Sequence, residues 1–269
     1  MPSFPERPSV LCAAGHDPSG GAGIQADAQA ILAAGAHPLT VITCLTSQDT
    51  CHVRRLWPQP HEQVAEQCQL LMDDSSVTAI KIGLIGSSRI VRALCDVLDN
   101  HPDLPVILDP ILASGSGQTL ADAALLNQIR TNLIPRCTLV TPNLHEARAL
   151  GAAEEPQDCA ASLLKRGCTS VLITGTHAED PEVTNRFYRR DGRSESWTWP
   201  RLPGDYHGSG CTLSSAIAAR MALGMSLVDA IAAAQDYTWN TLKQAYRSGH
   251  CQITPNRLFM LDTEQQGHR

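Results

Sequence analysis

Short apolar runs alternate with longer amphipathic stretches along most of the chain. The runs are blocks rich in valine, isoleucine and leucine, which is typical of strands buried on both faces. They occupy residues 9–15, 38–45, 78–83, 105–110, 138–142 and 170–175. Helical periodicity marks the stretches near 22–34, 60–73, 87–99, 121–132 and 156–166. This alternation predicts βαβ units, and hence a parallel sheet with helices on both faces.

The pattern changes after residue 181. Two alternating runs flank Asp191-Gly192, a dipeptide that favours a hairpin turn. Two more helical stretches follow, "GSGCTLSSAIAARMALG" and "SLVDAIAAAQDYTWNTLKQAY". Because no repeat, linker or boundary interrupts the chain, we expect one domain over residues 1–269. Its predicted fold is a three-layer αβα sandwich with a mostly parallel central sheet and a late antiparallel hairpin.

Composition narrows the functional classes. The chain has 269 residues, 43% of them hydrophobic, and a net charge of −6, so it lacks the basic footprint of a nucleic-acid or anionic-membrane binder. We find neither a signal peptide nor an apolar run long enough to span a membrane, and we expect a cytoplasmic protein. The ten cysteines form no C-x-x-C pair, so we interpret them as reduced thiols and expect no structural zinc site.

A glycine-rich loop, "GHDPSGGAGIQAD", follows the first predicted strand at residues 15–27. Gly21, Gly23 and Ala26 spell G-x-G-x-x-A, the dinucleotide-binding fingerprint, and so raise the remote alternative of an NAD-dependent oxidoreductase. In that fingerprint, however, the glycines follow the strand directly, whereas here residues 16–20 intervene. The loop is therefore a weak match, and we expect it to line a different kind of site. No Walker A sequence is present.

A second glycine turn, Gly208-Ser209-Gly210, precedes a helix predicted to begin near Cys211 or Thr212. Free backbone N–H groups and the helix dipole would favour an anion there, or the charge that develops on a phosphoryl group in transfer. Cys211 would project at the same place, where the helix N-terminus should favour its thiolate. A small apolar cysteine at a helix start is an equally open alternative.

Polar side chains follow other predicted strands. Asn143 and Glu146 are spaced so that they could bind Mg²⁺ through oxygen, although a helix-capping box is favoured by the residues alone. Asp109 ends the run "ILDP" and is either a metal or nucleotide ligand or a cap for the next turn. Gln48 offers both a donor and an acceptor, which suits the edge of an aminopyrimidine as well as solvent.

The segments together are more specific than any one of them. "AGHDPSGGAGIQAD", "VITCLTSQDT", "KIGLIGS", "DPIL", "TPNLHEA" and "HGSGCTLSSAIAA" run in this order along the chain. With them the chain resembles the bacterial hydroxymethylpyrimidine/phosphomethylpyrimidine kinases of the ribokinase superfamily. The resemblance implies a ribokinase-like αβα domain that forms a homodimer and uses ATP and Mg²⁺. It also implies that 4-amino-5-hydroxymethyl-2-methylpyrimidine is phosphorylated first to the monophosphate and then to the diphosphate, for thiamine biosynthesis.

The resemblance also implies roles for individual residues. Those expected near the pyrimidine are Gly15, Asp17, Ala22, Asp27, Gln48, Leu84 and Ile111. Those expected near ATP are Asn143, Thr174, Gly175 and Thr212. Asp109 and Glu146 are expected to hold the metal. Gly208, Ser209 and Gly210 correspond to the anion hole, and Cys211 takes the place of the aspartate base of most ribokinase relatives.

The chain departs from the family pattern in several places. Thr174-Gly175-Thr176-His177 replaces the K-G-G-H of many relatives, and the loop over residues 112–120 lacks a lysine that many of them carry. His16 stands where serine or threonine is common. These changes could shift the balance between the two phosphorylation steps. A pyridoxal or pyridoxine kinase of the same superfamily remains an alternative, as does a non-catalytic ligand sensor on a kinase fold.

Overall fold

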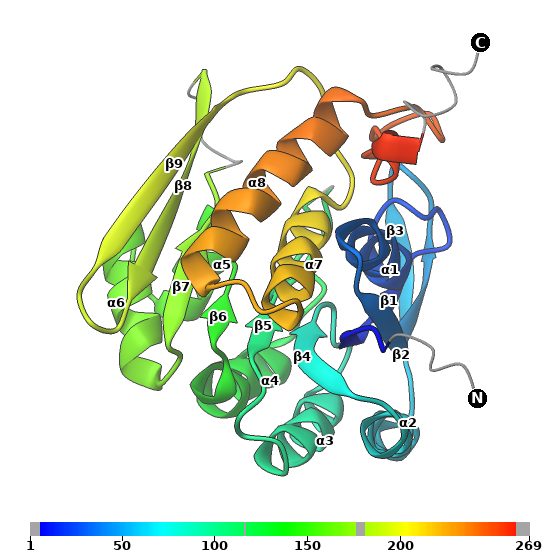
Figure 1. Cartoon of the computed structure of the whole chain (residues 1–269), viewed down its shortest axis with the longest axis vertical. Coiled ribbons are helices and arrows are strands. Elements are labelled where there is room, and N and C mark those ends of the chain that lie inside the picture. Colours follow the sequence, from blue (N-terminus) through cyan, green and yellow to red (C-terminus); the bar gives the residue numbers. More distant parts are fainter. Residues whose placement is uncertain (1–5, 116, 176–180, 262–269) are drawn as a thin grey trace.

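A computed structural model describes residues 6–115, 117–175 and 181–261 (Figure 1). Its sheet has nine strands in the order β3-β2-β1-β4-β5-β6-β7-β8-β9. The strands are β1 (Ser9–His16), β2 (His37–Gln48), β3 (Val53–Pro58), β4 (Val77–Ile82), β5 (Val106–Leu108), β6 (Leu139–Val140), β7 (Ser170–Ile173), β8 (Glu182–Arg189) and β9 (Ser194–Pro200). The six central strands, from β2 to β7 in space, are parallel. At the two edges, β3 pairs antiparallel with β2, β8 with β7, and β9 with β8.

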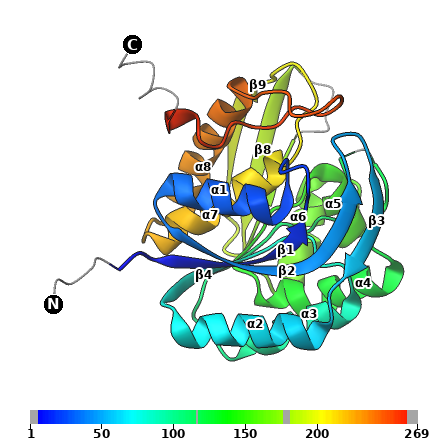
Figure 2. The same ribbon diagram turned by 90° about the vertical axis from the view of Figure 1, so that its right-hand side faces the viewer.

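Helices cover both faces of this sheet (Figure 2). One face carries α1 (Gly23–Ala34), α7 (Ser209–Ala222) and α8 (Leu227–Lys243). The other carries α2 (His61–Asp74), α3 (Ser88–Asp99), α4 (Ala123–Gln128), α5 (Leu144–Gly151) and α6 (Pro156–Arg166). The side chains of α7 are mostly small and ten of them are buried, so this helix fits closely between the sheet, α1 and α8. None of the described helices is both long and apolar enough to cross a membrane.

The predicted αβα sandwich and the hairpin around Asp191-Gly192 are confirmed. Strand β3 was not predicted, because Arg54 and Arg55 interrupt its apolar pattern on an exposed edge. The helix expected over 121–132 is shorter as a regular α-helix, because α4 ends at Gln128. The chain then continues as a π-helical turn, Ile129–Leu133, and a 3-10 turn, Ile134–Arg136. The second turn contains Pro135, a residue without a backbone N–H.

The order of the strands fixes where a ligand could bind. Within the sheet, β2 lies next to β1 on one side and β4 lies next to β1 on the other. Such a reversal leaves a crevice outside the carboxyl ends of the strands, which is where open α/β sheets bind ligands. The glycine loop after β1 and the segments after β4 and β5 lie at this edge.

Candidate active site

The two glycine loops contact each other at this edge of the sheet. A Cβ atom on Gly208, whose φ is +74°, would lie 2.2 Å from the carbonyl oxygen of Gly21. A Cβ atom on Gly21 would in turn lie 2.2 Å from the ring of His207. Both positions therefore require glycine, and the chain brings residues almost 190 positions apart into backbone contact.

Asp17 holds the first glycine loop in shape. Its Oδ1 accepts hydrogen bonds from the backbone and the hydroxyl of Ser19, both at 2.8 Å, and its Oδ2 accepts one from Ala22 N at 2.8 Å. His207 Nε2 lies 2.9 Å from the same Oδ2. Burial alone would raise the pKa of Asp17, but these partners outweigh it and lower the pKa to about 2. The carboxylate thus faces protein donors within the predicted substrate loop.

The second glycine turn opens helix α7. The helix begins at Ser209, two residues before the predicted start, with Gly208 as its N-cap in the left-handed region. No side chain caps it, so the first backbone N–H groups point out of the helix without an intrahelical partner. This geometry suits a phosphate oxygen, as expected for Gly208, Ser209 and Gly210.

Cys211 lies in the first turn of α7 and is only 4% exposed. Its sulfur lies close to the backbone N–H of Gly23, at the start of α1, and to the Asp109 carboxyl group. Burial and, next, the charge of Asp109 raise the pKa of this thiol well above its usual value. The expectation that the helix N-terminus favours the thiolate is therefore wrong for this arrangement, because burial and a neighbouring carboxylate outweigh the helix dipole.

Asp109 and Glu146 are two buried carboxyl groups near enough for the charge of Asp109 to act on Glu146, and Asp109 lies beside α7. Ser214 Oγ lies 3.4 Å from Asp109 Oδ2. Burial and then the nearby Asp109 raise the pKa of Glu146 to about 8, while burial also raises that of Asp109. The capping box is present as well, since Asn143 Oδ1 accepts from Glu146 N and Glu146 Oε2 accepts from Asn143 N. Two carboxyl groups that repel each other would be stabilised by a divalent cation, so the pair fits Mg²⁺.

Asp27 and Lys81 form a fully buried ion pair next to this site. Lys81 Nζ lies 2.7 Å from Asp27 Oδ1, and neither side chain has any exposed surface. Ser215 Oγ of α7 donates to the same oxygen at 2.7 Å. Burial would lower the pKa of Lys81, but Asp27 and then Cys211 and Asp109 raise it above its usual value. Lys81 was not singled out from the sequence, although a lysine inside the apolar run "TAIKIG" needs a buried partner.

Two predicted pyrimidine-binding residues, Gly15 and Leu84, lie together near the end of β1. A Cβ atom on Gly15 would be 2.9 Å from Leu84 Cδ2 and 3.1 Å from Cys44 Sγ, so this wall is closely packed. Gln48, at the end of β2, and Ile111 are half-buried. Ala22 is half-buried as the N-cap of α1.

The predicted ATP-binding residues are divided between two places. Asn143 and Thr174 lie on adjacent strand ends and are joined by a parallel bridge, and Gly175 N donates to Asn185 Oδ1 at 3.0 Å. Thr212 instead is fully buried in α7, where its hydroxyl donates to Gly208 O at 2.8 Å. Of the T-G-T-H departure, Thr176 and His177 lie outside the described residues.

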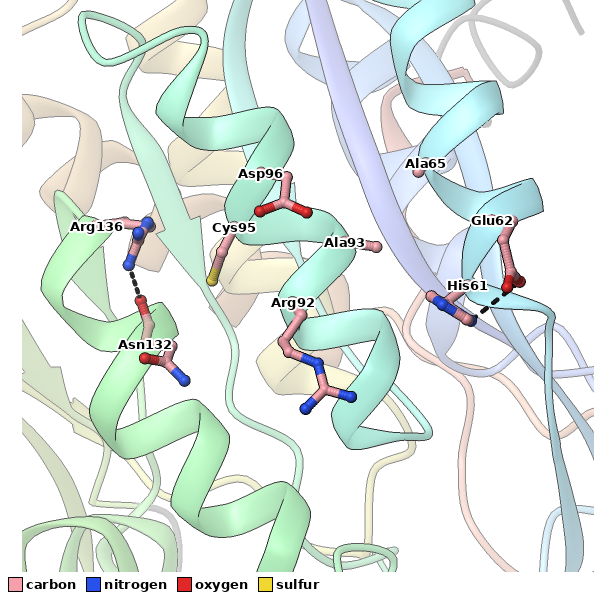
Figure 3. Close-up of a pocket in the computed structure, with 9 residues that line it drawn as sticks. All are labelled: His61, Glu62, Ala65, Arg92, Ala93, Cys95, Asp96, Asn132 and Arg136. Atoms are coloured by element: carbon pink, nitrogen blue, oxygen red, sulfur yellow. Dashed lines mark hydrogen bonds and ion pairs between the residues drawn. The ribbon is translucent and has the colours of Figure 1, made fainter.

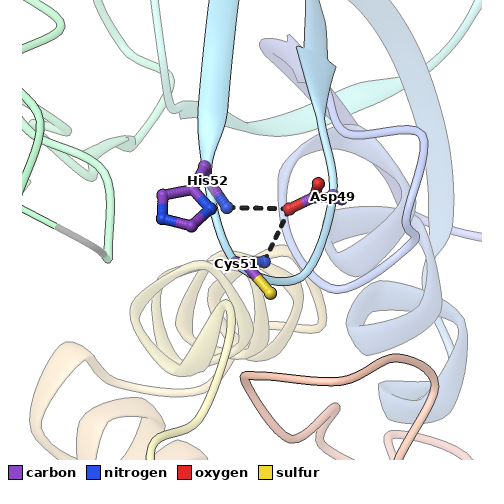
Figure 4. Close-up of side chains that lie close together, drawn as sticks. All are labelled: Asp49, Cys51 and His52. Carbon is purple, nitrogen blue, oxygen red and sulfur yellow. Dashed lines mark hydrogen bonds between the residues drawn. The ribbon is translucent and has the colours of Figure 1, made fainter.

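A disulfide corrects our interpretation of the cysteines. Cys51, at the tip of the β2–β3 hairpin, is bonded to Cys251, and the other eight cysteines are free and buried. Figure 4 shows the tip, where Asp49 Oδ1 accepts hydrogen bonds from the backbone of Cys51 and of His52, each at 2.8 Å. The sequence could not reveal the pair, because its members lie 200 residues apart.

A separate hollow of about 540 Å³ lies between α2, α3 and the turns after α4 (Figure 3). His61 and Glu62 line it from α2, and Arg92 and Asp96 from α3. These helices cover the face of the sheet opposite α1 and α7. None of the predicted site residues lines this hollow, so it is not part of the site built by the glycine loops.

Comparison with known proteins identifies the family of the chain. A family model described as phosphomethylpyrimidine kinase matches residues 17–256. The chain belongs to this family. It is 36% identical to the hydroxymethylpyrimidine/phosphomethylpyrimidine kinase of Streptomyces coelicolor, over 90% of this chain and 91% of that protein. It is 38% identical to the enzyme of the same name from Salmonella typhimurium, over 80% and 83%.

Solved structures support the fold and the class of enzyme. A phosphomethylpyrimidine kinase from Clostridium difficile superposes with a TM-score of 0.77 and 28% identity, covering 88% of this chain and all of that one. A pyridoxal kinase from Staphylococcus aureus, in complex with pyridoxal, superposes with a TM-score of 0.85 over 94% of both chains. At 22% identity this second likeness concerns the fold alone. The protein is thus a phosphotransferase with a ribokinase-like fold.

Proposed function

We propose that the chain phosphorylates 4-amino-5-hydroxymethyl-2-methylpyrimidine with ATP, and then phosphorylates the monophosphate to the diphosphate. The observation that carries this proposal is the uncapped N-terminus of α7, which presents backbone donors beside Cys211 and opposite the first glycine loop. The relatives described above are named as kinases of these two substrates.

The residues divide the work of phosphoryl transfer. The residues that would enclose and orient the ring are Gly15, Ala22, Leu84, Ile111 and Gln48. Asp17 and Asp27, which the resemblance also places near the pyrimidine, bond to protein groups in the structure and would hold the surrounding elements. In the first step the hydroxymethyl oxygen attacks the γ-phosphorus of ATP and ADP leaves, while the N–H groups of α7 stabilise the charge on the transferred group. The hydroxyl proton passes to the Cys211 thiolate, which the raised pKa makes a strong base but a minor species. In the second step the attacking phosphate oxygen is already largely ionised.

We propose that Asp109 and Glu146 hold Mg²⁺, which would neutralise charge on the phosphates of ATP. Asn143, Thr174 and Gly175 lie on the neighbouring strand ends, where they would contact the nucleotide. We further propose a single catalytic domain that works as a homodimer, as the family resemblance implies, and a location in the cytoplasm. The Cys51–Cys251 disulfide would be unusual in that compartment.

The deciding experiment measures the ADP that the protein forms from ATP in the presence of Mg²⁺. The protein is supplied in turn with hydroxymethylpyrimidine, its monophosphate, pyridoxal or no acceptor. We expect ADP with both pyrimidines and only the background rate with pyridoxal. Turnover with pyridoxal alone would overturn the proposal in favour of the second kinase class.

A further inference from the structure

We infer that Arg257 is a positioning residue that holds the two glycine loops at the spacing required for phosphoryl transfer. The inference rests on the proposed function, because it assigns the same site a further component. Arg257 lies near the end of the described chain and its side chain is 1% exposed. Nothing in the sequence pattern marked it.

The guanidinium group of Arg257 connects both loops directly. On one side Arg257 donates to the carbonyl oxygen of Gly21, and at 3.5 Å to that of Gly20. On the other side its Nε donates to Thr212 Oγ1 at 2.8 Å. A fourth contact, at 3.3 Å, reaches Gln29 Oε1 on α1. One planar group thus joins the first loop, α1 and the first turn of α7.

These contacts fix the peptide groups that shape the site. The peptide between Gly21 and Ala22 is held at its carbonyl by Arg257 and at its N–H by Asp17. The hydroxyl of Thr212 connects Arg257 to the start of α7, since it accepts a hydrogen bond from Arg257 and donates one to the carbonyl of Gly208, the N-cap of α7. A shift of Arg257 would therefore change the distance between the first glycine loop and the N–H groups at the start of α7.

A guanidinium group is well suited to this task and an ammonium group is not. Arginine presents five donors in a planar fork, which can serve acceptors on both sides at once, whereas lysine is a compact point charge on a flexible stem. Among the described residues, the guanidinium group of Arg257 donates only to neutral oxygens, so geometry rather than pairing with a carboxylate accounts for the contacts. Arg257→Lys keeps the charge and should still lose the function.

The kinetic test compares Arg257→Lys with Arg190→Lys. Arg190 is a matched control, because its guanidinium also donates to two successive backbone carbonyls, those of Gly167 and Cys168, beside β7. For Arg257→Lys we expect kcat to fall about a hundredfold, as misplacement by an ångström does, with both KM values within about threefold of wild type. Arg190→Lys should keep the wild-type kcat. A wild-type kcat in Arg257→Lys, or a loss confined to KM, would overturn the inference.

A second readout does not depend on the reaction. Native protein is treated with iodoacetamide, and alkylation of each cysteine is followed by mass spectrometry. In Arg257→Lys we expect Cys211 to react at least about tenfold faster than in wild type, with Cys12 and Cys159 unchanged, because the loops separate locally. Equal acceleration at all three cysteines would mean general unfolding and would overturn the positioning role. If the wild type phosphorylates no pyrimidine, the proposed function fails, while this readout still decides the role of Arg257.

Discussion

Lys81 Nζ and Asp27 Oδ1 lie 2.7 Å apart with no exposed surface on either side chain, at the centre of the contact between β4, α1 and α7. A buried ion pair adds little over apolar residues of the same size, but removing one partner leaves a charge without compensation. We therefore expect Lys81→Met to lower the free energy of unfolding by about 3–5 kcal/mol. Urea denaturation followed by tryptophan fluorescence measures the loss.

The double variant Lys81→Met, Asp27→Asn is the control for this prediction. An amide at position 27 removes the charge but can still accept the hydrogen bond from Ser215. The double variant should be more stable than Lys81→Met alone. Losses that simply add would contradict a role for the buried charge.

Asp17 makes stability depend on pH. Its pKa in the folded protein is about 2, below its ordinary value of 3.8. A lowered pKa contributes stability that is fully present above the unfolded value and is lost as the pH falls through the folded value. At pH 7 we expect Asp17→Asn to be less stable than wild type by about 2 kcal/mol, and the gap to narrow from pH 4 toward pH 2. Urea denaturation of both proteins at several pH values tests this, and a gap independent of pH contradicts it.

The Cys51–Cys251 disulfide closes a loop of 200 residues. A cross-link over so long a segment restricts the unfolded chain, and its removal typically costs about 2–4 kcal/mol. We expect the double variant Cys51→Ser, Cys251→Ser to show that loss in the absence of reductant and no difference from wild type in its presence. Peptide mapping without reduction should recover the linked pair. A stable wild type with both thiols free would contradict the disulfide.

The sequence predicts those elements whose own residues carry a clear pattern. Strands such as the one in "PVILDP" appear as apolar blocks because both faces of a central parallel strand are buried. Strand β3 was missed because it is an exposed edge that contains Arg54 and Arg55. The two glycine loops were predicted from glycines clustered just before helices. Arg257 was missed because its partner Gly21 lies 236 residues away, and such pairing is set by the complete fold.

For Cys211 the sequence predicts the position of the thiol but not its pKa. Its place at a helix N-terminus was predicted from "HGSGCTL" and is confirmed. The local rule that follows, a lowered pKa, fails because the thiol is buried and because Asp109, which follows β5 far earlier in the chain, lies next to it. Local sequence thus predicted the position of the sulfur, and only the folded chain determines its acidity.

The raised pKa of Glu146 predicts that binding at the proposed metal site depends on pH. Its pKa is raised to about 8, so at neutral pH a proton competes with the cation for this carboxyl group. With Mn²⁺ as a spectroscopic substitute for Mg²⁺, we expect the dissociation constant to fall up to about tenfold per pH unit between pH 6 and pH 8. Glu146→Gln can keep the hydrogen bond to Asn143 N, so the capping box survives. This variant should bind Mn²⁺ weakly and with little dependence on pH, as measured by electron paramagnetic resonance, and wild-type binding in it would contradict the metal site.

We expect the loss of Cys211 to affect the two proposed phosphorylation steps differently. The alcohol must lose a proton as it attacks, whereas the monophosphate attacks through an oxygen that is already largely ionised, so only the first step needs a base. Since general bases contribute about 10²–10⁴-fold, Cys211→Ala should slow phosphorylation of the alcohol by about that factor and slow that of the monophosphate by less than about tenfold. The α7 donors are backbone groups and remain in the variant, which is why the second step should survive. Separate initial rates with each purified substrate make the comparison, and Ser214→Ala controls for a small change beside Asp109 that leaves the thiol in place. Equal losses in both steps would show that Cys211 acts on the geometry of the anion hole and not on the proton.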